Sequence, residues 1–381
     1  MRVIRVLFVD DEPLLLRGIE RPLRRLRPDW QVTYTTSAVA ALALLEREPV
    51  DVIVSDVGMP QMDGLVFLRT ARHRFPQVAR LVLSGEARST DRVRAVLDIH
   101  QWIAKPCPVR DLVEVIERTF LPRGAIEDAE LLATLCGIAC LPSRLAFYRA
   151  AVRAIEQAAP LAELVTLLES DIGMTAKVIQ LVNGAFFGTA QRITSVAQAV
   201  RTLGVEHVRA VLAAADVAYH PEVDELTERG RFVATLARTF ATDHHDDVYL
   251  AGLLYDVAAL ASPPSLRPRL ATMLESRIAA LLLATWGLPP EVVAAVAFHQ
   301  DPSGAPDPRE HRLCCVALAT ALATELRAPA TLPGIVDARA AALGLSATSC
   351  RARADALAAA CQEPGISSTM PSMTFLPRST R

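Results

Sequence analysis

Long uninterrupted hydrophobic runs are missing from this chain of 381 residues. The longest apolar run, around Ile278 to Trp286, is much shorter than the ~20 residues that a membrane-spanning helix needs. The N-terminal segment MRVIRVLFVDDEP has the pattern of a strand, without the separate apolar core and small-residue cleavage site of an export signal. We therefore expect a cytoplasmic protein with no membrane partner.

The chain also has no excess of charge of one sign and no ordered set of cysteines. Its formal net charge is −2, so nothing attracts nucleic acid or anionic lipid to the molecule as a whole. We find no helix-turn-helix with a basic recognition helix and expect no nucleic-acid partner. The seven cysteines are odd in number and irregularly spaced, which excludes a disulfide framework and a paired zinc motif.

Residues 3 to 120 alternate short apolar runs with longer segments of helical periodicity. This alternation predicts an α/β doubly wound domain, with five parallel strands and five helices. Pro13–Leu26 is expected to be a helix, and Ser37 can cap the next one. The predicted strands are Val3–Val9, Gln31–Tyr34, Val50–Ser55, Arg80–Leu83 and Trp102–Ala104.

After Leu121 the pattern changes to helix after helix, separated by Gly and Pro turn signals. A second, all-α domain is therefore predicted, followed by an Ala-rich extension and a polar tail that is expected to be disordered. The expected divisions are a first domain at 1–121, a linker at 122–129, a helical bundle at 130–326, the extension at 327–365 and the tail at 366–381.

Three carboxylates are predicted to meet at the carboxyl edge of the sheet. Asp10 and Asp11 follow the first strand and Asp56 follows the third, and ligands bind at this edge of parallel sheets. Carboxylates so close repel one another unless a hard cation lies between them, and oxygen donors suit Mg²⁺. Ser84, after the fourth strand, can hydrogen-bond a phosphoryl oxygen, and Lys105, after the fifth, supplies a positive charge. The set predicts a phosphoryl-transfer pocket with Asp56 as the nucleophile.

The N-terminal residues 3–120 resemble the receiver domain of two-component response regulators. The motifs that carry this resemblance are VDDEP, SDVGMPQMDG, LSG and the dipeptide KP, in this order. The resemblance implies a sensor histidine kinase as the partner that donates the phosphoryl group. It also implies a role for each site residue: phosphoacceptor Asp56, metal ligands Asp10, Asp11, Asp56 and the backbone carbonyl of Gly58, and phosphate-binding Ser84 and Lys105.

Trp102 lies where receiver domains usually have a Tyr or Phe whose rotamer reports phosphorylation. Two interpretations remain open, a switch residue or an edge-strand aromatic that packs on a helix. A phosphoryl group adds up to about two negative charges and would draw Ser84 and Lys105 toward Asp56. The fourth strand, the fourth helix and the fifth strand would then offer a new face to a partner.

Residues 130 to about 325 resemble an HDOD domain, which is related to HD-type metal-dependent phosphohydrolases. The segments that carry this resemblance are LPS (141–143), ESDIGMTAKVIQLVNGAFFG (169–188), RITSVAQAVRTLGVEHVRAVL (192–212), AGLLYDVAAL (251–260) and WGLPPEVVAAVAFHQDP (286–302).

Several positions where an active HD enzyme has metal ligands differ in this chain. The adjacent His and Asp are replaced by Tyr255 and Asp256, and the upstream segment ERGR (228–231) has no histidine. Ala258 and Ala259 stand where a Gly and a Lys often follow this pair. His299 and Gln300 stand where an active enzyme has paired histidines near the end of the domain. We therefore expect no catalytic metal and no other cofactor in this domain.

Other groups of chemically active residues in the helical domain have simpler interpretations. The run His244, His245, Asp246 and Asp247 is expected to be a solvated helix start. Cys314 and Cys315 are expected to be buried on a helix face, and Phe186 and Phe187 to lie in a turn between helices.

The function predicted from the sequence is a response regulator of a phosphorelay, in which Asp56 controls a non-catalytic HDOD output domain that binds a protein partner. The alternative is an enzyme that hydrolyses a cyclic dinucleotide with a divergent HD centre. A transcription factor is a third hypothesis, disfavoured because no basic recognition helix is found. The sequence leaves open the kinase, the downstream partner, the sign of the switch and the oligomeric state, a homodimer included.

Overall fold

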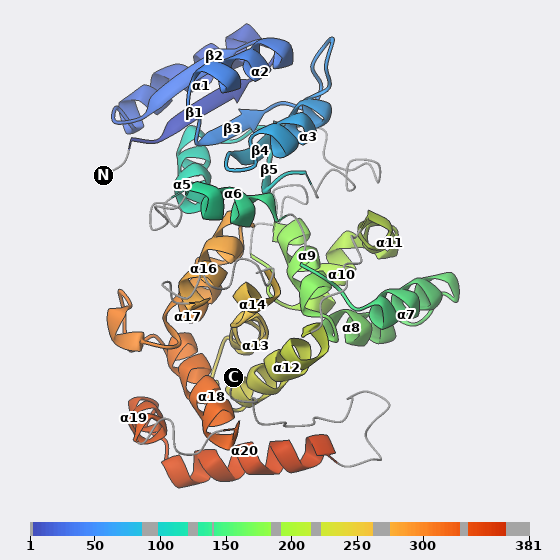
Figure 1. The fold of residues 1–381 in the computed structure, drawn as a ribbon, viewed down its shortest axis with the longest axis vertical. Coiled ribbons are helices and arrows are strands. Elements are labelled where there is room, and N and C mark those ends of the chain that lie inside the picture. Colours follow the sequence, from blue (N-terminus) through green and yellow to red (C-terminus); the bar gives the residue numbers. More distant parts are fainter. Residues whose placement is uncertain are drawn as a thin grey trace.

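The computed structural model describes residues 3–85, 98–120, 129–138, 141–183, 192–214, 222–261, 275–327 and 334–362. Within these residues the chain forms an α/β part and a helical part, stacked along the long axis of the molecule (Figure 1). The predicted fourth helix, the Phe186–Phe187 turn and the C-terminal tail lie outside the described residues.

The N-terminal part is built on a five-stranded sheet with the order β2-β1-β3-β4-β5. All neighbouring strands are parallel, as predicted, and the observed strands begin or end within two residues of the expected positions. The strands are β1 (Arg5–Val9), β2 (Gln31–Thr35), β3 (Val52–Ser55), β4 (Ala79–Ser84) and β5 (Gln101–Ala104).

Helices cover both faces of this sheet because successive side chains of a strand point to opposite faces. On β1, Val6 and Phe8 pack in one cluster with the buried residues of the first and last helices of this part. Leu7 and Val9 face the other side, where two further helices cover them. Ser37 caps the second helix by accepting from the amide of Ala40, as predicted. The helices are α1 (Pro13–Leu26), α2 (Ala38–Arg47), α3 (Gly64–Arg74) and α5 (Val109–Phe120).

The rest of the described chain is helical, which confirms the prediction of an all-α second part. Its first helices are α6 (Ala129–Gly137), α7 (Leu145–Glu156), α8 (Leu161–Glu169), α9 (Ile172–Asn183), α10 (Val196–Leu203) and α11 (Val205–Ala214). The next are α12 (Val223–Phe240), α13 (His245–Leu254), α14 (Val257–Ala261), α16 (Glu275–Thr285) and α17 (Pro290–Phe298). A short 3-10 turn η4 (Pro302–Gly304) leads to α18 (His311–Arg327), α19 (Ile335–Ala342) and α20 (Ala347–Gln362).

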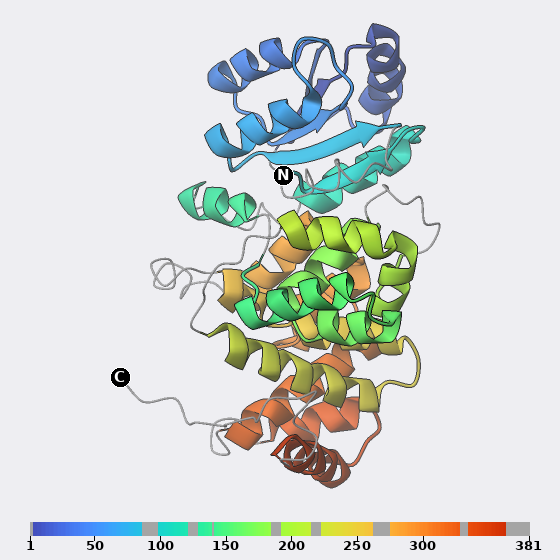
Figure 2. The same ribbon diagram turned by 90° about the vertical axis from the view of Figure 1, so that its right-hand side faces the viewer.

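Helices α12 and α13 lie in close contact at the centre of the helical part. A side-chain carbon at Gly252 would lie 2.7 Å from the Cα of Ala234, and one at Gly230 would lie 2.7 Å from the carbonyl oxygen of Leu253. Glycine is therefore required at both crossing points. Helices α19 and α20 lie at the end farthest from the sheet (Figure 2), and Arg351 of α20 forms ion pairs with Glu325 and Asp337.

The helices and the cysteines can be compared with what the sequence predicts about membranes and disulfides. Among the helices that the structure describes, none combines the length and the apolar character needed to cross a bilayer. Six of the seven cysteines lie in described residues, and these six are free thiols. Cys314 and Cys315 are buried on α18, as predicted.

Candidate functional site

The carboxyl edge of the sheet brings two of the predicted carboxylates together around one cation. The ammonium of Lys105 lies 2.7 Å from an oxygen of Asp10 and 2.7 Å from an oxygen of Asp56. Both carboxylates are buried, so their negative charges are little screened by water. The other oxygens accept backbone hydrogen bonds, Asp10 from the amide of Glu12 at 2.9 Å and Asp56 from that of Gly58 at 2.7 Å.

Strand pairing explains why residues so distant in sequence meet here. Val9 of β1 pairs with Ser55 of β3, so Asp10 and Asp56 leave the sheet side by side. The amide of Asp56 continues the ladder by donating to the carbonyl of Val9 at 2.8 Å. In the same way the amide of Lys105 donates to Ser84 at 3.1 Å. The parallel register therefore places the acidic pair and the lysine at one edge.

The charge of Lys105 depends on these two carboxylates. Burial by itself lowers the pKa of Lys105, but hydrogen bonds to Asp10 and Asp56 outweigh it and raise the pKa above its ordinary value. The ammonium therefore stays charged at neutral pH and can neutralise negative charge in the pocket.

The loop after Asp56 is fixed by a glycine that has no room for a side chain. A side-chain carbon at Gly64 would lie 1.8 Å from the carbonyl oxygen of Asp56. The amide of Gly64 donates to the carbonyl of Val57, and Asp63 caps α3 by accepting from the amide of Leu65. The motif MDG therefore holds the start of α3 directly against the backbone of Asp56.

The remaining predicted site residues lie around this centre. Ser84 is buried at the end of β4, and Asp11 is partly exposed next to Asp10. Gly58 contacts the site through its amide, as described above. Trp102 is buried in the edge strand β5, opposite Val82 of β4. The roles predicted for these residues stay predictions: metal binding by Asp10, Asp11, Asp56 and Gly58, phosphate acceptance by Asp56, phosphate binding by Ser84 and Lys105, and the switch at Trp102.

The donor set at this edge fits Mg²⁺. Oxygens of Asp10 and Asp56 already converge on one positive charge, the ammonium of Lys105, and carboxylate oxygens are the ligands that Mg²⁺ prefers. The residues that would hold the ion are Asp10, Asp11, Asp56 and the carbonyl of Gly58.

A doubly wound parallel sheet with paired aspartates at its carboxyl edge and a lysine after the last strand defines the class of signalling receiver domains. Comparison with known families gives the particular family. Residues 6–117 match the response regulator receiver domain, and residues 141–277 match the HDOD domain. The chain is therefore a two-component response regulator with an N-terminal receiver domain and a C-terminal HDOD domain. Receiver domains generally use Mg²⁺ for phosphorylation and imply a cognate histidine kinase.

Each individual relative matches only part of the chain. The chain is 36% identical over 129 residues to the hydrogenase transcriptional regulatory protein HoxA of Cupriavidus necator, which covers 33% of this chain and 26% of HoxA. It thus spans about a quarter of the length of this relative. A solved receiver domain of an HD domain-containing protein from Pseudomonas fluorescens Pf-5 is 23% identical, with a TM-score of 0.31, and covers 33% of this chain and 92% of that one. The MmoQ response regulator from Methylococcus capsulatus is 18% identical, with a TM-score of 0.45, and covers 56% of this chain and 97% of that one.

In the HDOD domain, several of the positions that the resemblance compares with HD-type metal ligands take part in other contacts. Arg229 of α12, within the segment ERGR, forms an ion pair with Asp256. Tyr255 packs edge-on against the ring of His299, with 5.4 Å between ring centroids. Burial raises the pKa of Tyr255 and lowers the pKa of His299 to about 4, so both rings are neutral at pH 7. The positive charge paired with Asp256 is therefore the guanidinium of Arg229.

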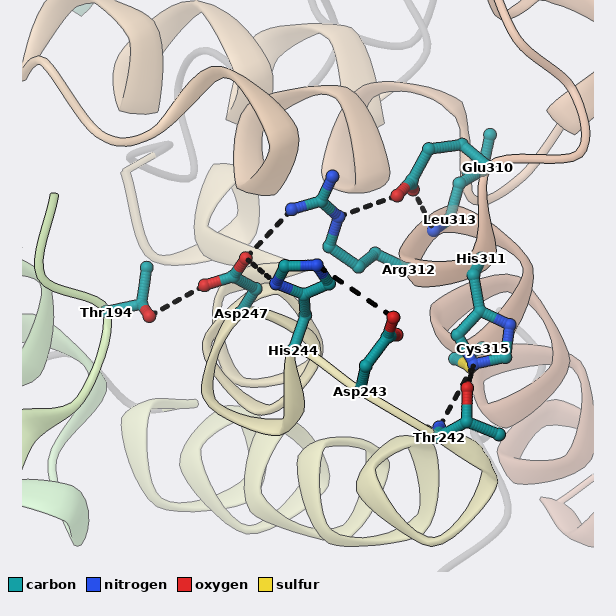
Figure 3. Close-up of polar contacts among 10 residues, drawn as sticks. All are labelled: Thr194, Thr242, Asp243, His244, Asp247, Glu310, His311, Arg312, Leu313 and Cys315. Carbon is teal, nitrogen blue, oxygen red and sulfur yellow. Dashed lines mark hydrogen bonds and ion pairs between the residues drawn. The ribbon is translucent and has the colours of Figure 1, made fainter. Parts of the chain in front are cut away.

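The His–Asp run at the start of α13 forms a polar network (Figure 3). His244 lies at the N-cap of α13 with a positive φ of 47° and is exposed. Asp247 accepts from the hydroxyl of Thr194 at 2.7 Å and from Arg312 of α18 at 2.9 Å. Among the described residues, no group of three or more His, Cys, Asp or Glu side chains could hold a metal ion. The run lies at the start of α13, as expected. Asp247 is half-buried, however, and joins three segments of the domain rather than being solvated.

Two arginines have roles that the sequence reasoning missed. Arg229 was noted only as part of a segment without histidine. Arg80 is fully buried in β4, where its guanidinium donates to the carbonyls of Asp98 and Val78, each at 2.8 Å. The sequence signal for the role of Arg80 is a charged residue inside a predicted strand whose other residues are apolar.

Proposed function

We propose that the chain is a phosphorylation-controlled signalling protein in which a histidine kinase phosphorylates Asp56 and the HDOD domain binds a protein partner without catalysing a reaction. The observation that supports the first half is the ammonium of Lys105 between Asp10 and Asp56. The observation that supports the second half is the ion pair between Arg229 and Asp256.

Phosphoryl transfer at this site needs positioning and charge neutralisation. A carboxylate oxygen of Asp56 attacks the phosphorus atom of the phosphohistidine, the new O–P bond forms, and the bond from phosphorus to the histidine nitrogen breaks. The electron pair of that bond returns to the kinase imidazole. Lys105 and the hydroxyl of Ser84 then bind the phosphoryl oxygens. A bound Mg²⁺ would neutralise part of the negative charge that gathers at this edge.

The HDOD domain is proposed to be non-catalytic because a fixed side-chain cation already neutralises its remaining acidic residue. A metal ion next to Asp256 would be repelled by the guanidinium of Arg229. The Nδ1 of His299 donates to the carbonyl of Val296, which leaves Nε2 able to bind a metal, but the ring is packed edge-on against Tyr255. Tyrosine in place of the adjacent histidine removes a further ligand.

Labelling with acetyl phosphate tests the phosphoacceptor. The full-length protein should become phosphorylated in Mg²⁺, and Asp56→Asn should not. Asp51→Asn is a matched control, because Asp51 is also buried next to β3 but pairs with Arg5. Labelling that persists in Asp56→Asn would contradict the proposal.

A second assay tests the output domain. The full-length protein, incubated with Mn²⁺ and cyclic dinucleotides, should release no hydrolysis product. Turnover that is lost in Asp256→Asn would establish the enzymatic alternative instead. A pull-down that compares phosphorylated and unphosphorylated protein should identify a partner whose binding depends on Asp56.

A further inference from the structure

The receiver and HDOD domains contact each other at the start of β4 and β5 (Figure 1). These ends lie opposite the carboxyl edge of the sheet that carries Asp10 and Asp56, which we call the acidic edge. We call these contacts the domain joint. Its residues are Arg80, His100, Gln101 and Thr119 of the receiver domain with Cys136, Gln180, Ala284, Thr285 and Gly287 of the following helices.

The joint covers the edge strand of the sheet with hydrogen bonds from the other domain. Gln180 of α9 donates to the carbonyl of His100 at 3.0 Å. The carbonyl of Cys136 in α6 accepts from Arg80 at 3.2 Å and lies 3.0 Å from Nε2 of His100. Because Nδ1 of His100 accepts from the amide of Arg80 at 2.9 Å, the neutral ring carries its proton on Nε2 and donates to Cys136. The carbonyl of His100, just before the edge strand β5, is thus paired within the chain.

Gln101, the first residue of β5, makes the most specific contact of the joint. Its buried side-chain nitrogen donates to the hydroxyl of Thr119 at 2.7 Å and lies 3.3 Å from the carbonyl of Thr285 and 3.4 Å from that of Ala284. The last carbonyls of a helix lack partners within the helix. A receiver side chain therefore helps to cap α16 of the HDOD domain.

The backbone after α16 is shaped to receive this side chain. Gly287 has a positive φ of 76°, and a side-chain carbon there would lie 2.9 Å from the amide carbon and oxygen of Gln101. Any other residue at 287 would strain the backbone and displace Gln101. The fit is thus specific to the pair Gln101 and Gly287.

The two strands of the joint also lead to the phosphoacceptor site. β4 carries Arg80 near one end and Ser84 at the other, and β5 leads from Gln101 to Lys105. Gln101 and Lys105 are separated by four residue steps, or about 13 Å along a strand. The two strands are paired in register from Leu81 to Ser84. Because paired strands move together, a displacement of Ser84 or Lys105 at the acidic edge also moves the ends of β4 and β5 in the joint.

We propose that the domain joint opposes phosphorylation of Asp56, with Gln101 as the residue that couples the two domains. This inference rests on the proposed function of Asp56. The docked domains coexist here with Lys105 bound to both Asp10 and Asp56, an arrangement that a phosphoryl group must change. Drawing Ser84 and Lys105 toward the phosphate displaces β4 and β5 and weakens the contacts of Gln101. Because coupling between sites is reciprocal, loss of the joint favours the phosphorylated state.

Rates of acetyl phosphate labelling in Mg²⁺ test this coupling in the full-length protein. Gln101→Leu, Gly287→Val and Gln180→Leu each break the joint from a different side and should label about fivefold faster or more. Gln198→Leu, the same change at an exposed position of α10, should label at the native rate. Equal rates for the native protein and for every joint variant that shows a cooperative melting transition would overturn the coupling.

A second measurement uses the native protein and needs no variant. Phosphorylation should raise the rate of hydrogen exchange at the amides of Trp286, Gly287 and Leu288, which close the end of α16. Unchanged exchange after complete labelling would also overturn the proposal. Failure of the proposed function looks different, because the native protein would then not be labelled at Asp56 at all.

Discussion

The ammonium of Lys105 and the carboxylate of Asp56 are separated by 2.7 Å, although the two residues are 49 positions apart in the sequence. The same ammonium contacts Asp10. This cation therefore links the two carboxylates, and we expect it to bind a phosphoryl group on Asp56.

Removal of this charge should slow phosphorylation. Lys105→Met is expected to reduce acetyl phosphate labelling of Asp56 by about 100-fold, the typical effect of losing one preorganised charge-stabilising group. Arg110→Met removes the same charge from an exposed position of α5 and should label normally. Similar rates in the two variants would exclude a direct role for Lys105.

Gly64 should be essential for the geometry of the phosphoacceptor loop. Gly64→Ala places a methyl group within 1.8 Å of the carbonyl oxygen of Asp56 and is expected to destabilise the protein by about 2 kcal/mol and to slow labelling. Gly18→Ala is the matched control, because nothing lies within 4 Å of the added carbon. In the middle of α1 it should stabilise by about 1 kcal/mol. Urea unfolding and labelling rates measure both effects.

Asp171 should be an important structural residue of the HDOD domain. Its buried carboxylate accepts from the hydroxyl of Ser143 and from the amides of Arg144 and Met174. Asp171→Ala leaves these donors buried without a partner and should lower the free energy of unfolding by about 2 kcal/mol. Asp224→Ala, at an exposed carboxylate of α12, should cost about 0.5 kcal/mol or less. Equal effects in urea unfolding would contradict the capping role.

His299 should make stability depend on pH in a defined window. Burial lowers its pKa from 6.5 to about 4, so between these values the unfolded chain binds one proton more than the folded chain. The free energy of unfolding should then fall as pH falls from 6.5 to 4, by about 3 kcal/mol from this residue. Across this pH range, the free energy of unfolding from urea curves should change less with pH for His299→Leu than for the native protein. An unchanged slope would show that His299 does not titrate in this way.

The ion pair of Arg229 with Asp256 can be tested with a double-mutant cycle. Arg229→Met leaves a largely buried carboxylate without its cation and is expected to destabilise the protein by about 3 kcal/mol. Adding Asp256→Asn removes the unpaired charge and should recover part of this loss. Urea unfolding of the four proteins measures the coupling. Strictly additive effects would show that the two residues do not interact in solution.

Local patterns determined most of the receiver domain. Strand runs bounded by turn signals fixed the five parallel strands to within two residues, and Pro13 and Ser37 marked the starts of α1 and α2. The order of the motifs along the chain predicts that Asp10, Asp56 and Lys105 lie together. This succeeded because parallel strands in a doubly wound sheet bring their carboxyl ends to one edge, so chain order already implies proximity.

Only the tertiary structure decided how the two domains meet and which residue pairs with Asp256. The pairing of Arg229 with Asp256, and of Gln101 with the end of α16, joins helices or domains with no periodic relation in the sequence. The sequence did show Arg80 in a strand and Gly287 after a helix. Their partners depend on packing between distant segments, and such contacts are set by the complete fold rather than by local propensity.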